Sequence, residues 1–179
     1  DAVAELMGGA PVIASAGQSF PVETGYLGAP PAGRSGDNFV PAIVSAVHRA
    51  LREESGSVLV FLPGEGEIRR AAALLADAGL PGDTDLMPLY GALPQAEQDR
   101  AIARPAPGRR KVVLSTAIAE TSLTIEGIRV VVDGGRARRP RFDPQSGMTR
   151  LFTEPVSQAE AEQRQGRAGR LEPGLCYRL

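Results

Sequence analysis

The sequence predicts an α/β domain built on a mainly parallel central sheet, and three observations support this fold class. Apolar runs at 58–62, within 111–116 and at 130–132 are typical of strands buried on both faces. Segments with helical spacing of apolar residues separate these runs. A length of 179 residues with 42% hydrophobic content suits one globular domain with a sizeable core. Alternation of strand and helix therefore favours parallel strands joined by crossover helices.

Each expected element follows from a local pattern. Apolar residues recur at helical spacing from Val40 to Leu51, and Gly56 ends that pattern. Pro63-Gly64 stops the next apolar run, and a Pro/Gly-rich connection is expected at 28–37. The expected elements, in order, are strands at 11–15 and 22–27, a helix from residue 40, a strand at 58–62, a helix at 67–78, a strand at 85–90, a helix at 94–103, and strands at 111–116 and 130–132.

A projecting β-hairpin is expected at about 136–152. Two strand-like segments, 136–142 and 148–152, flank an Asp-Pro-Gln-Ser-Gly stretch with turn chemistry. The hairpin is rich in arginine, which suits contact with phosphate but equally suits a solvated edge that resists aggregation. Its arginines are Arg136, Arg138, Arg139, Arg141 and Arg150.

The run Gln-Arg-Gln-Gly-Arg-Ala-Gly-Arg near the C-terminus is the most informative motif. Ser157 and Glu160 form a capping box, which begins a helix just before it. Gln163, Arg167 and Arg170 have the spacing i, i+4 and i+7 and are therefore expected on one helical face. Two converging guanidinium groups suggest a polyphosphate partner, because each matches a pair of phosphate oxygens. The alternative is a solvated basic helix end.

The segment 115–127, which follows a predicted strand, is dense in hydroxyl groups. Open α/β sheets bind ligands at the carboxyl ends of their strands, so chemistry is expected just after Leu62, Leu114 and Val132. Hydroxyl groups and backbone amides together can hold phosphate or sugar oxygens. The alternative is that these side chains only cap helices and turns.

Composition excludes several classes of protein and site. A single cysteine, Cys176, rules out an internal disulfide, and one histidine, His48, leaves too few ligands for ordinary zinc binding. No metal site is therefore expected. Apolar stretches are too short to span a bilayer, and the first residues lack the pattern of a signal peptide. A cytoplasmic protein without membrane contact is expected.

Taken in order, these segments resemble the motifs of DEAH-box ATP-dependent RNA helicases of superfamily 2, and motifs V and VI together are specific. The matching segments are 59–64 (motif IV), 88–94 (motif IVa), 115–127 (motif V), 141–148 (the hairpin between motifs V and VI) and 163–170 (motif VI). The resemblance covers nearly the whole chain. The residues within these motifs, together with residues 12–15 and 20–22, are most similar to those of the bacterial HrpB type.

The resemblance implies a RecA-like three-layer domain that spans residues 1–179 and is the second of two motor domains. Neither a Gly-x-x-x-x-Gly-Lys-Ser/Thr loop nor an Asp-Glu-x-His tetrad occurs, and Lys111 has the wrong context for a phosphate-loop lysine. The first RecA-like domain and accessory domains are therefore expected outside this chain. ATP with Mg²⁺ would be bound mainly by that first domain, so the chain alone is expected not to hydrolyse ATP.

The family's catalytic contacts fall on motif VI. By resemblance, Arg167 and Arg170 are arginine fingers on the γ-phosphate, where positive charge stabilises the transferring phosphoryl group. Gln163 would position the attacking water or contact the γ-phosphate. Arg164 points away from that helical face and is expected to be structural.

Motif V would contact the rest of the nucleotide and the RNA. By resemblance, Ser122 senses the nucleotide state, while Thr124 and Glu126 lie near the ribose, although many relatives have aspartate in place of Glu126. Two departures, Ala117 for asparagine and Pro63 for threonine, remove polar groups that the family often has on the RNA side. The RNA-binding residues that the resemblance implies are Gly64, Thr116, Arg136 and Arg138.

The implied partners are the first RecA-like domain of the same protein and single-stranded RNA, or an RNA duplex with an overhang. A motor that moves from the 3′ end toward the 5′ end should grip the backbone without reading bases. The isolated domain is expected to be a monomer. Two alternatives stay open: a non-hydrolysing nucleic-acid-binding or regulatory module derived from a helicase domain, and an unrelated anion-binding α/β enzyme.

Overall fold

The computed structural model describes residues 2–12, 20–28, 38–120, 124–144 and 147–179. Its strands are β1 (Val22–Tyr26), β2 (Ser57–Phe61), β3 (Thr84–Leu89), β4 (Arg110–Ser115), β5 (Ile128–Asp133), β6 (Arg136–Asp143), β7 (Met148–Pro155) and β8 (Gly174–Arg178). The helices are α1 (Ala2–Leu6), α2 (Phe39–Glu53), α3 (Glu65–Ala78), α4 (Gln95–Ile102) and α5 (Gln158–Gln165), with a 3₁₀ turn η1 (Ala117–Ala119). No helix in these ranges is both long and apolar enough to cross a bilayer.

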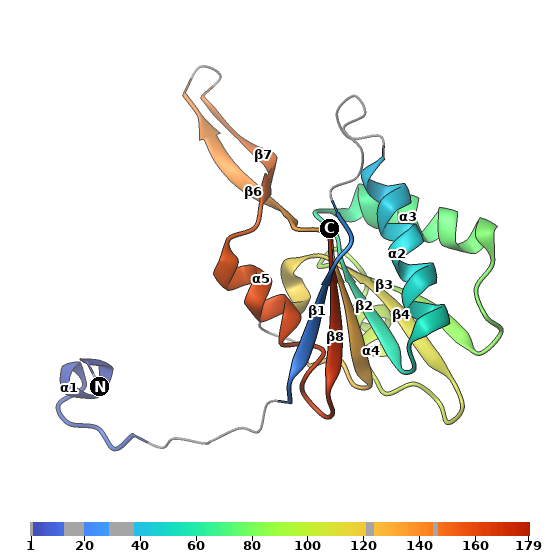
Figure 1. Cartoon of the computed structure of the whole chain (residues 1–179). Coiled ribbons are helices and arrows are strands. Elements are labelled where there is room, and N and C mark those ends of the chain that lie inside the picture. The colour runs from blue at the N-terminus through green and yellow to red at the C-terminus, as the bar shows by residue number, and fades with distance from the viewer. Residues whose placement is uncertain (1, 13–19, 29–37, 121–123, 145–146) are drawn as a thin grey trace.

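Six strands form the central sheet in the order β1-β8-β5-β2-β4-β3, and every neighbouring pair is parallel. Strands β6 and β7 form a separate antiparallel hairpin that projects away from the sheet (Figure 1). The predicted α/β class, with a mainly parallel sheet and a projecting hairpin, is confirmed.

Most of the expected elements occur within one to three residues of their predicted bounds. The strand expected at 11–15 is not observed at residues 11 and 12, and its remaining residues lie outside the described part of the chain. All but the first residue of the connection at 28–37 lies outside it as well. Strand β8, which the sequence pattern did not reveal, lies inside the sheet between β1 and β5.

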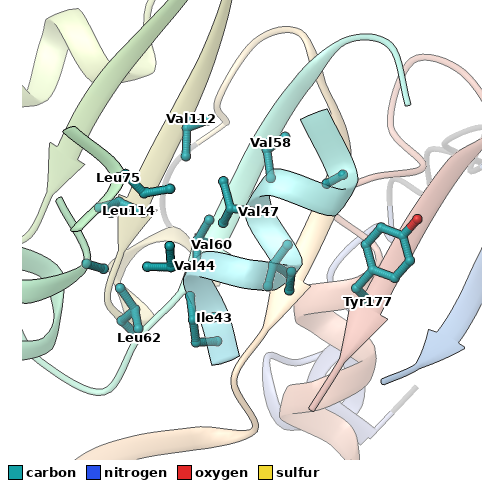
Figure 2. Packing of buried hydrophobic residues seen from close by; sticks show 14 of the residues in the cluster. Ile43, Val44, Val47, Val58, Val60, Leu62, Leu75, Val112, Leu114 and Tyr177 are labelled. Carbon is teal, nitrogen blue, oxygen red and sulfur yellow. The ribbon is translucent and has the colours of Figure 1, made fainter. Parts of the chain in front are cut away.

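The sheet buries apolar side chains on both of its faces, as the continuous runs predicted. Val58 and Val60 belong to a core that includes Val47 of α2 and Leu75 of α3 (Figure 2). Their neighbour Leu59 belongs to a second core on the opposite face, together with residues of α4 and η1. Because each buried Val or Leu contributes about 1.5–3 kcal/mol, these two cores fix the order of the layers.

Helix α5 begins at the predicted capping box. The Ser157 hydroxyl accepts a hydrogen bond from the Glu160 backbone N–H at 3.3 Å, and the Glu160 carboxylate accepts one from the Ser157 backbone N–H at 2.7 Å. The Ser157 hydroxyl also donates to this carboxylate at 2.7 Å. The pKa of Glu160 is lowered to about 2, chiefly by the hydrogen bonds that the Ser157 N–H and hydroxyl donate to it and then by Arg139. The start of the helix is therefore fixed by its own sequence.

The prediction that Gln163, Arg167 and Arg170 share a helical face is wrong, because α5 ends at Gln165. Beyond it the backbone N–H groups of Arg167 and Ala168 donate to carbonyls three residues earlier, at 3.1 and 3.0 Å. This i to i−3 pattern winds the chain more tightly than an α-helix. Arg167 therefore lies in a turn just beyond the helix, and Arg170 lies in the bend that follows this turn.

Candidate functional site

Gln163, Arg167 and Arg170 line one cavity of about 370 Å³, together with Glu120 and Gly166. We call this the arginine cavity. Arg167 is only 8% exposed, whereas the side chains of Gln163 and Arg170 are exposed. The three residues predicted from motif VI thus line one cavity. Gln163 lies on α5, whereas the two arginines lie beyond the end of that helix.

A larger cavity of about 680 Å³ adjoins the arginine cavity, and Gly166, Arg167 and Arg170 line both. Thr124 and Glu126 of motif V also line the larger cavity. The Arg170 guanidinium donates a hydrogen bond to the Thr124 hydroxyl, which joins motifs V and VI directly. The predicted ribose contacts and the predicted fingers therefore share one continuous space.

Sequence reasoning missed part of this lining. Arg104, just after α4, adds a third guanidinium, and no motif or spacing pointed to it. The apolar part of the lining is formed by Ile125, Ile128 and Leu171. A cavity with cationic and apolar walls can hold a ligand that has both an anionic and a hydrophobic part.

Charge in this region favours an anion. The pKa of Arg167 is lowered from its ordinary value mainly by burial and then by the positive charge of Arg170, while Glu120 opposes the shift. Two cations close together repel each other, and an anion placed near both of them reduces that repulsion. A phosphate group in the arginine cavity would match both guanidinium forks.

The glycine at position 169 is required by packing. A Cβ at Gly169 would lie 2.5 Å from the carbonyl oxygen of Phe20 and 2.6 Å from Cγ2 of Val22. The Phe20 N–H in turn donates to the Gly169 carbonyl at 2.8 Å. A Cβ at Gly174, where β8 begins, would lie 2.5 Å from the Ala168 carbonyl oxygen. These two glycines let motif VI lie directly against β1 and β8.

A third cavity, of about 420 Å³, contains three of the four predicted RNA contacts: Gly64, Thr116 and Arg138. Gly64 follows β2 and Thr116 follows β4, so both lie at carboxyl ends of strands, as expected. Arg138 extends from β6 over Gly64, where an added Cβ would lie 2.7 Å from its Nη1. Its Nη2 also pairs with Glu67 of α3 at 3.0 Å. We call this the backbone cavity.

Arg136 is not part of the backbone cavity. Its guanidinium stacks on the ring of Phe39 at 4.5 Å from the centroid, at the base of the hairpin. Ala117 and Pro63, the two departures from the family pattern, line the backbone cavity and present no side-chain hydrogen-bonding group there. Ser122, the predicted nucleotide sensor, lies outside the described residues.

Lys111 lines none of the three cavities, and its contacts are structural. Its ammonium group donates to the carbonyls of Ala101, at 2.7 Å, and of Ala103, at the end of α4. Burial lowers the pKa of Lys111 to about 8. Within the described ranges, no cluster of His, Cys, Asp and Glu side chains could hold a metal ion.

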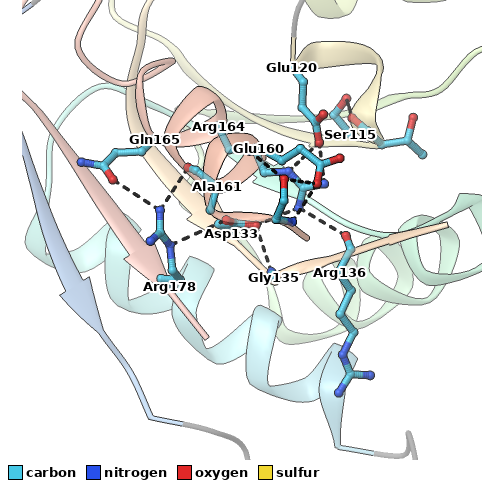
Figure 3. Close-up of polar contacts among 12 residues, drawn as sticks. Ser115, Glu120, Asp133, Gly135, Arg136, Glu160, Ala161, Arg164, Gln165 and Arg178 are labelled. Atoms are coloured by element: carbon cyan, nitrogen blue, oxygen red, sulfur yellow. Dashed lines mark hydrogen bonds and ion pairs between the residues drawn. The ribbon is translucent and has the colours of Figure 1, made fainter. Parts of the chain in front are cut away.

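Arg164 is fully buried, in agreement with the structural role expected for it. Its Nε donates to Glu120 at 2.6 Å, and its Nη1 donates to Asp133 at 2.9 Å and to the Arg136 carbonyl at 3.2 Å (Figure 3). Arg178 of β8 approaches Asp133 from the other side, at 3.8 Å. Two cations and two carboxylates therefore balance one another beneath the motif VI turns.

Sequence comparison agrees with this arrangement. The profile of the helicase conserved C-terminal domain matches residues 41–172 of the chain. The chain belongs to this helicase family.

The relatives of this helicase domain are longer proteins. The ATP-dependent RNA helicase HrpB of Escherichia coli strain K12 is 52% identical over 179 residues, which are 100% of this chain and 22% of that protein. The pre-mRNA-splicing factor ATP-dependent RNA helicase prp22 of Schizosaccharomyces pombe is 44% identical over 174 residues, 94% of this chain and 15% of that protein. The helicase domain thus spans about a fifth or less of the length of these relatives.

Solved structures show the same fold. A crystal structure of the Escherichia coli DEAH/RHA helicase HrpB matches with a TM-score of 0.87 and 52% identity, covering 99% of this chain and 22% of that one. A structure described as the Escherichia coli DExH-box NTPase HrpB matches with a TM-score of 0.86 over 100% of this chain and 22% of its own. The predicted resemblance to a RecA-like domain of DEAH-box helicases, of the HrpB type, is confirmed.

Proposed function

We propose that this helicase domain is the second motor domain of an ATP-dependent DEAH-box RNA helicase, and that it supplies arginine fingers to ATP bound between two RecA-like domains. The observation that carries the proposal is the arginine cavity, in which Gln163, Arg167 and Arg170 meet. Arg167 and Arg170 neutralise charge on the γ-phosphate as it is transferred, and Gln163 orients the attacking water.

The larger cavity extends this proposal to the rest of the nucleotide. Thr124 and Glu126 carry hydroxyl and carboxylate oxygens that can accept hydrogen bonds from ribose hydroxyl groups. Ser122 is proposed as the sensor of the nucleotide state. ATP and Mg²⁺ are held mainly by the first RecA-like domain, because the phosphate-loop and Asp-Glu-x-His motifs do not occur among these 179 residues. The chain by itself is therefore proposed not to hydrolyse ATP.

The backbone cavity is the proposed RNA site. The Gly64 amide and the Thr116 hydroxyl can donate to phosphate oxygens, and Arg138 adds positive charge from the hairpin. Arg136 is proposed as a second cation at the root of the same hairpin. None of these groups reads a base edge, as a motor that moves from the 3′ end toward the 5′ end requires. A monomeric, cytoplasmic protein remains the prediction.

The test is RNA-stimulated ATP hydrolysis by the longer protein that joins this chain to its natural upstream sequence. Arg167→Ala and Arg170→Ala should each lower kcat by about tenfold or more while RNA binding is retained. Arg109→Ala removes an arginine that pairs with Asp85 at a distance from the cavities and should leave hydrolysis unchanged. Unchanged hydrolysis in both finger variants would refute the proposal and favour a non-hydrolysing RNA-binding module.

A further inference from the structure

Arg164 belongs to motif VI but lines neither the arginine cavity nor the backbone cavity. Its side chain is 1% exposed, and it lies between the segments that form the two cavities. Glu120, one of its partners, lines the arginine cavity. Arg136, whose carbonyl it also bonds, begins the hairpin that carries Arg138 into the backbone cavity.

The planar guanidinium of Arg164 directs its nitrogens to three different segments. Nε and Nη2 contact Glu120 at 2.6 and 2.5 Å, and Nη1 bridges Asp133 and the Arg136 carbonyl. Its face lies 4.9 Å from the centroid of the Phe61 ring at the end of β2. Because the fork is rigid, a shift of any one segment would misalign its hydrogen bonds to the others.

A buried charge network adds little net free energy to the stability of a fold. Apolar side chains of similar volume often serve as well or better, since buried ions must lose their hydration. Asp133 is 0% exposed, and its Oδ1 also accepts from the Gly135 N–H at 2.9 Å, where the chain turns into the hairpin. The network therefore fixes the direction in which the hairpin leaves the sheet.

A second contact joins the hairpin to α5. Arg139 of β6 pairs with Glu160, whose carboxylate also completes the capping box of α5. The hairpin is thus bound to α5 at its root through Arg164 and one turn of helix earlier through Glu160. Gln163 lies between these two positions and is carried on the same helix.

The geometry points to Arg164 as a positioning residue that locks the hairpin to α5, so that the RNA-facing hairpin and the nucleotide-facing residues of motif VI move as one unit. The functional consequence of this inference rests on the proposed function. RNA held by the hairpin would set the position of Gln163 and of the segment that carries Arg167 and Arg170. Arg164 itself contacts neither ligand.

The rigidity of the connection between the hairpin and α5 can be measured in this chain without any ligand. Spin labels on Thr149→Cys and Ala159→Cys would report the distance between β7 and α5, both at exposed positions. The native Cys176 is buried, and burial raises the pKa of its thiol to about 12, so that it stays unlabelled. We expect a narrow distance distribution that broadens in Arg164→Gln. Arg109→Gln, which breaks a distant ion pair, should leave it narrow.

Arg164→Lys keeps the positive charge between Glu120 and Asp133 but loses the planar guanidinium and its directed hydrogen bonds. This variant replaces Arg164→Gln in the experiment if the glutamine variant does not fold. In the longer protein we expect this variant to reduce RNA stimulation of kcat by at least about tenfold, with the KM for ATP changed by less than about threefold. A role limited to stability would lower Tm and leave both the stimulation and the distance distribution unchanged, which would overturn the inference. Full hydrolysis by Arg167→Ala and Arg170→Ala would instead overturn the proposed function.

Discussion

Two glycines of motif VI, Gly166 and Gly169, should respond in opposite ways to an added methyl group. In Gly169→Ala the new Cβ would lie 2.5 Å from the Phe20 carbonyl oxygen, a backbone atom, and 2.6 Å from Val22. Contacts this close cannot be relieved by a side-chain rotation alone, so β1 must shift. In Gly166→Ala the closest atoms are the carbonyls of Glu162 and Gln163, at 3.5 and 3.6 Å, which is ordinary contact.

The expected magnitudes follow from these distances. Overpacking of a filled site costs about 1–3 kcal/mol, so Gly169→Ala should lose about 2 kcal/mol of unfolding free energy. For a domain of this size that loss corresponds to a decrease in Tm of about 4–8 °C. Gly166 has φ −60° and ψ −11°, which alanine adopts readily, so Gly166→Ala should be neutral or gain up to about 1 kcal/mol.

Thermal unfolding of the three proteins, followed by circular dichroism at one protein concentration, would measure the difference. Urea titration would check that the m-value is unchanged, so that the comparison concerns stability alone. The reasoning would be refuted if Gly169→Ala unfolded at the wild-type temperature, or if Gly166→Ala lost as much stability as Gly169→Ala. The first result would mean that motif VI does not lie against β1 in the way described, and the second that the close contacts of Gly169 do not set the difference between the two glycines.

Three further predictions concern buried or capped groups. The folded-state pKa of Glu160, about 2, lies below its ordinary value of 4.5, so its stabilisation is complete above pH 4.5 and is lost as the pH falls toward 2. Glu160→Gln should cost about 1 kcal/mol at pH 7, and urea titrations should show the gap to wild type closing in acid. Asp133→Asn should cost about 3–5 kcal/mol in the same assay, because it removes one of the two carboxylates that balance Arg164 and Arg178 in the buried network. Asp85→Asn, at an exposed pair, should cost less than about 1 kcal/mol. Cys176 should resist thiol reagents at pH 7.5 in the folded protein and react at once in denaturant, as mass spectrometry would show.

Each of these predictions has a contradicting result. A gap between wild type and Glu160→Gln that stayed constant from pH 7 to pH 2 would exclude the capping carboxylate as the source of acid sensitivity. Equal losses for Asp133→Asn and Asp85→Asn would show that the buried network contributes no more than a surface pair. Rapid labelling of Cys176 in native buffer would mean that β8 opens readily.

Local pattern was enough to predict the centre of the sheet. The runs that form β2, β4 and β5 are apolar on both faces, which is typical of strands in a covered parallel sheet. The capping box at Ser157 predicted the start of α5. Strand β8 was missed because its five residues include a glycine and an arginine and form no long apolar run. Its pairing with β1 joins residues about 150 positions apart, and no local window contains that information.

Part of the candidate site could be predicted because linear motifs keep its residues close in sequence. Gln163, Arg167 and Arg170 do line one cavity, but the reason given for it, a shared helical face, was wrong because the helix ends at Gln165. Arg104 was missed, since its place in the larger cavity depends on how the end of α4 approaches motif V. Such positions are set by tertiary packing rather than by spacing.

The position of β8 also bears on how the chain folds during synthesis. Among the described strands, β1 pairs only with β8, so residues near the start of the chain have no sheet partner until residues 174–178 exist. Strands β2 to β5 can assemble earlier, but the sheet would end at β5 with an exposed edge. Closure of this long loop makes the last step slow and open to misassembly. A chain cut off before Gly174 would therefore lack β8 and leave β1 without a sheet partner, so that only four of the six strands could pair.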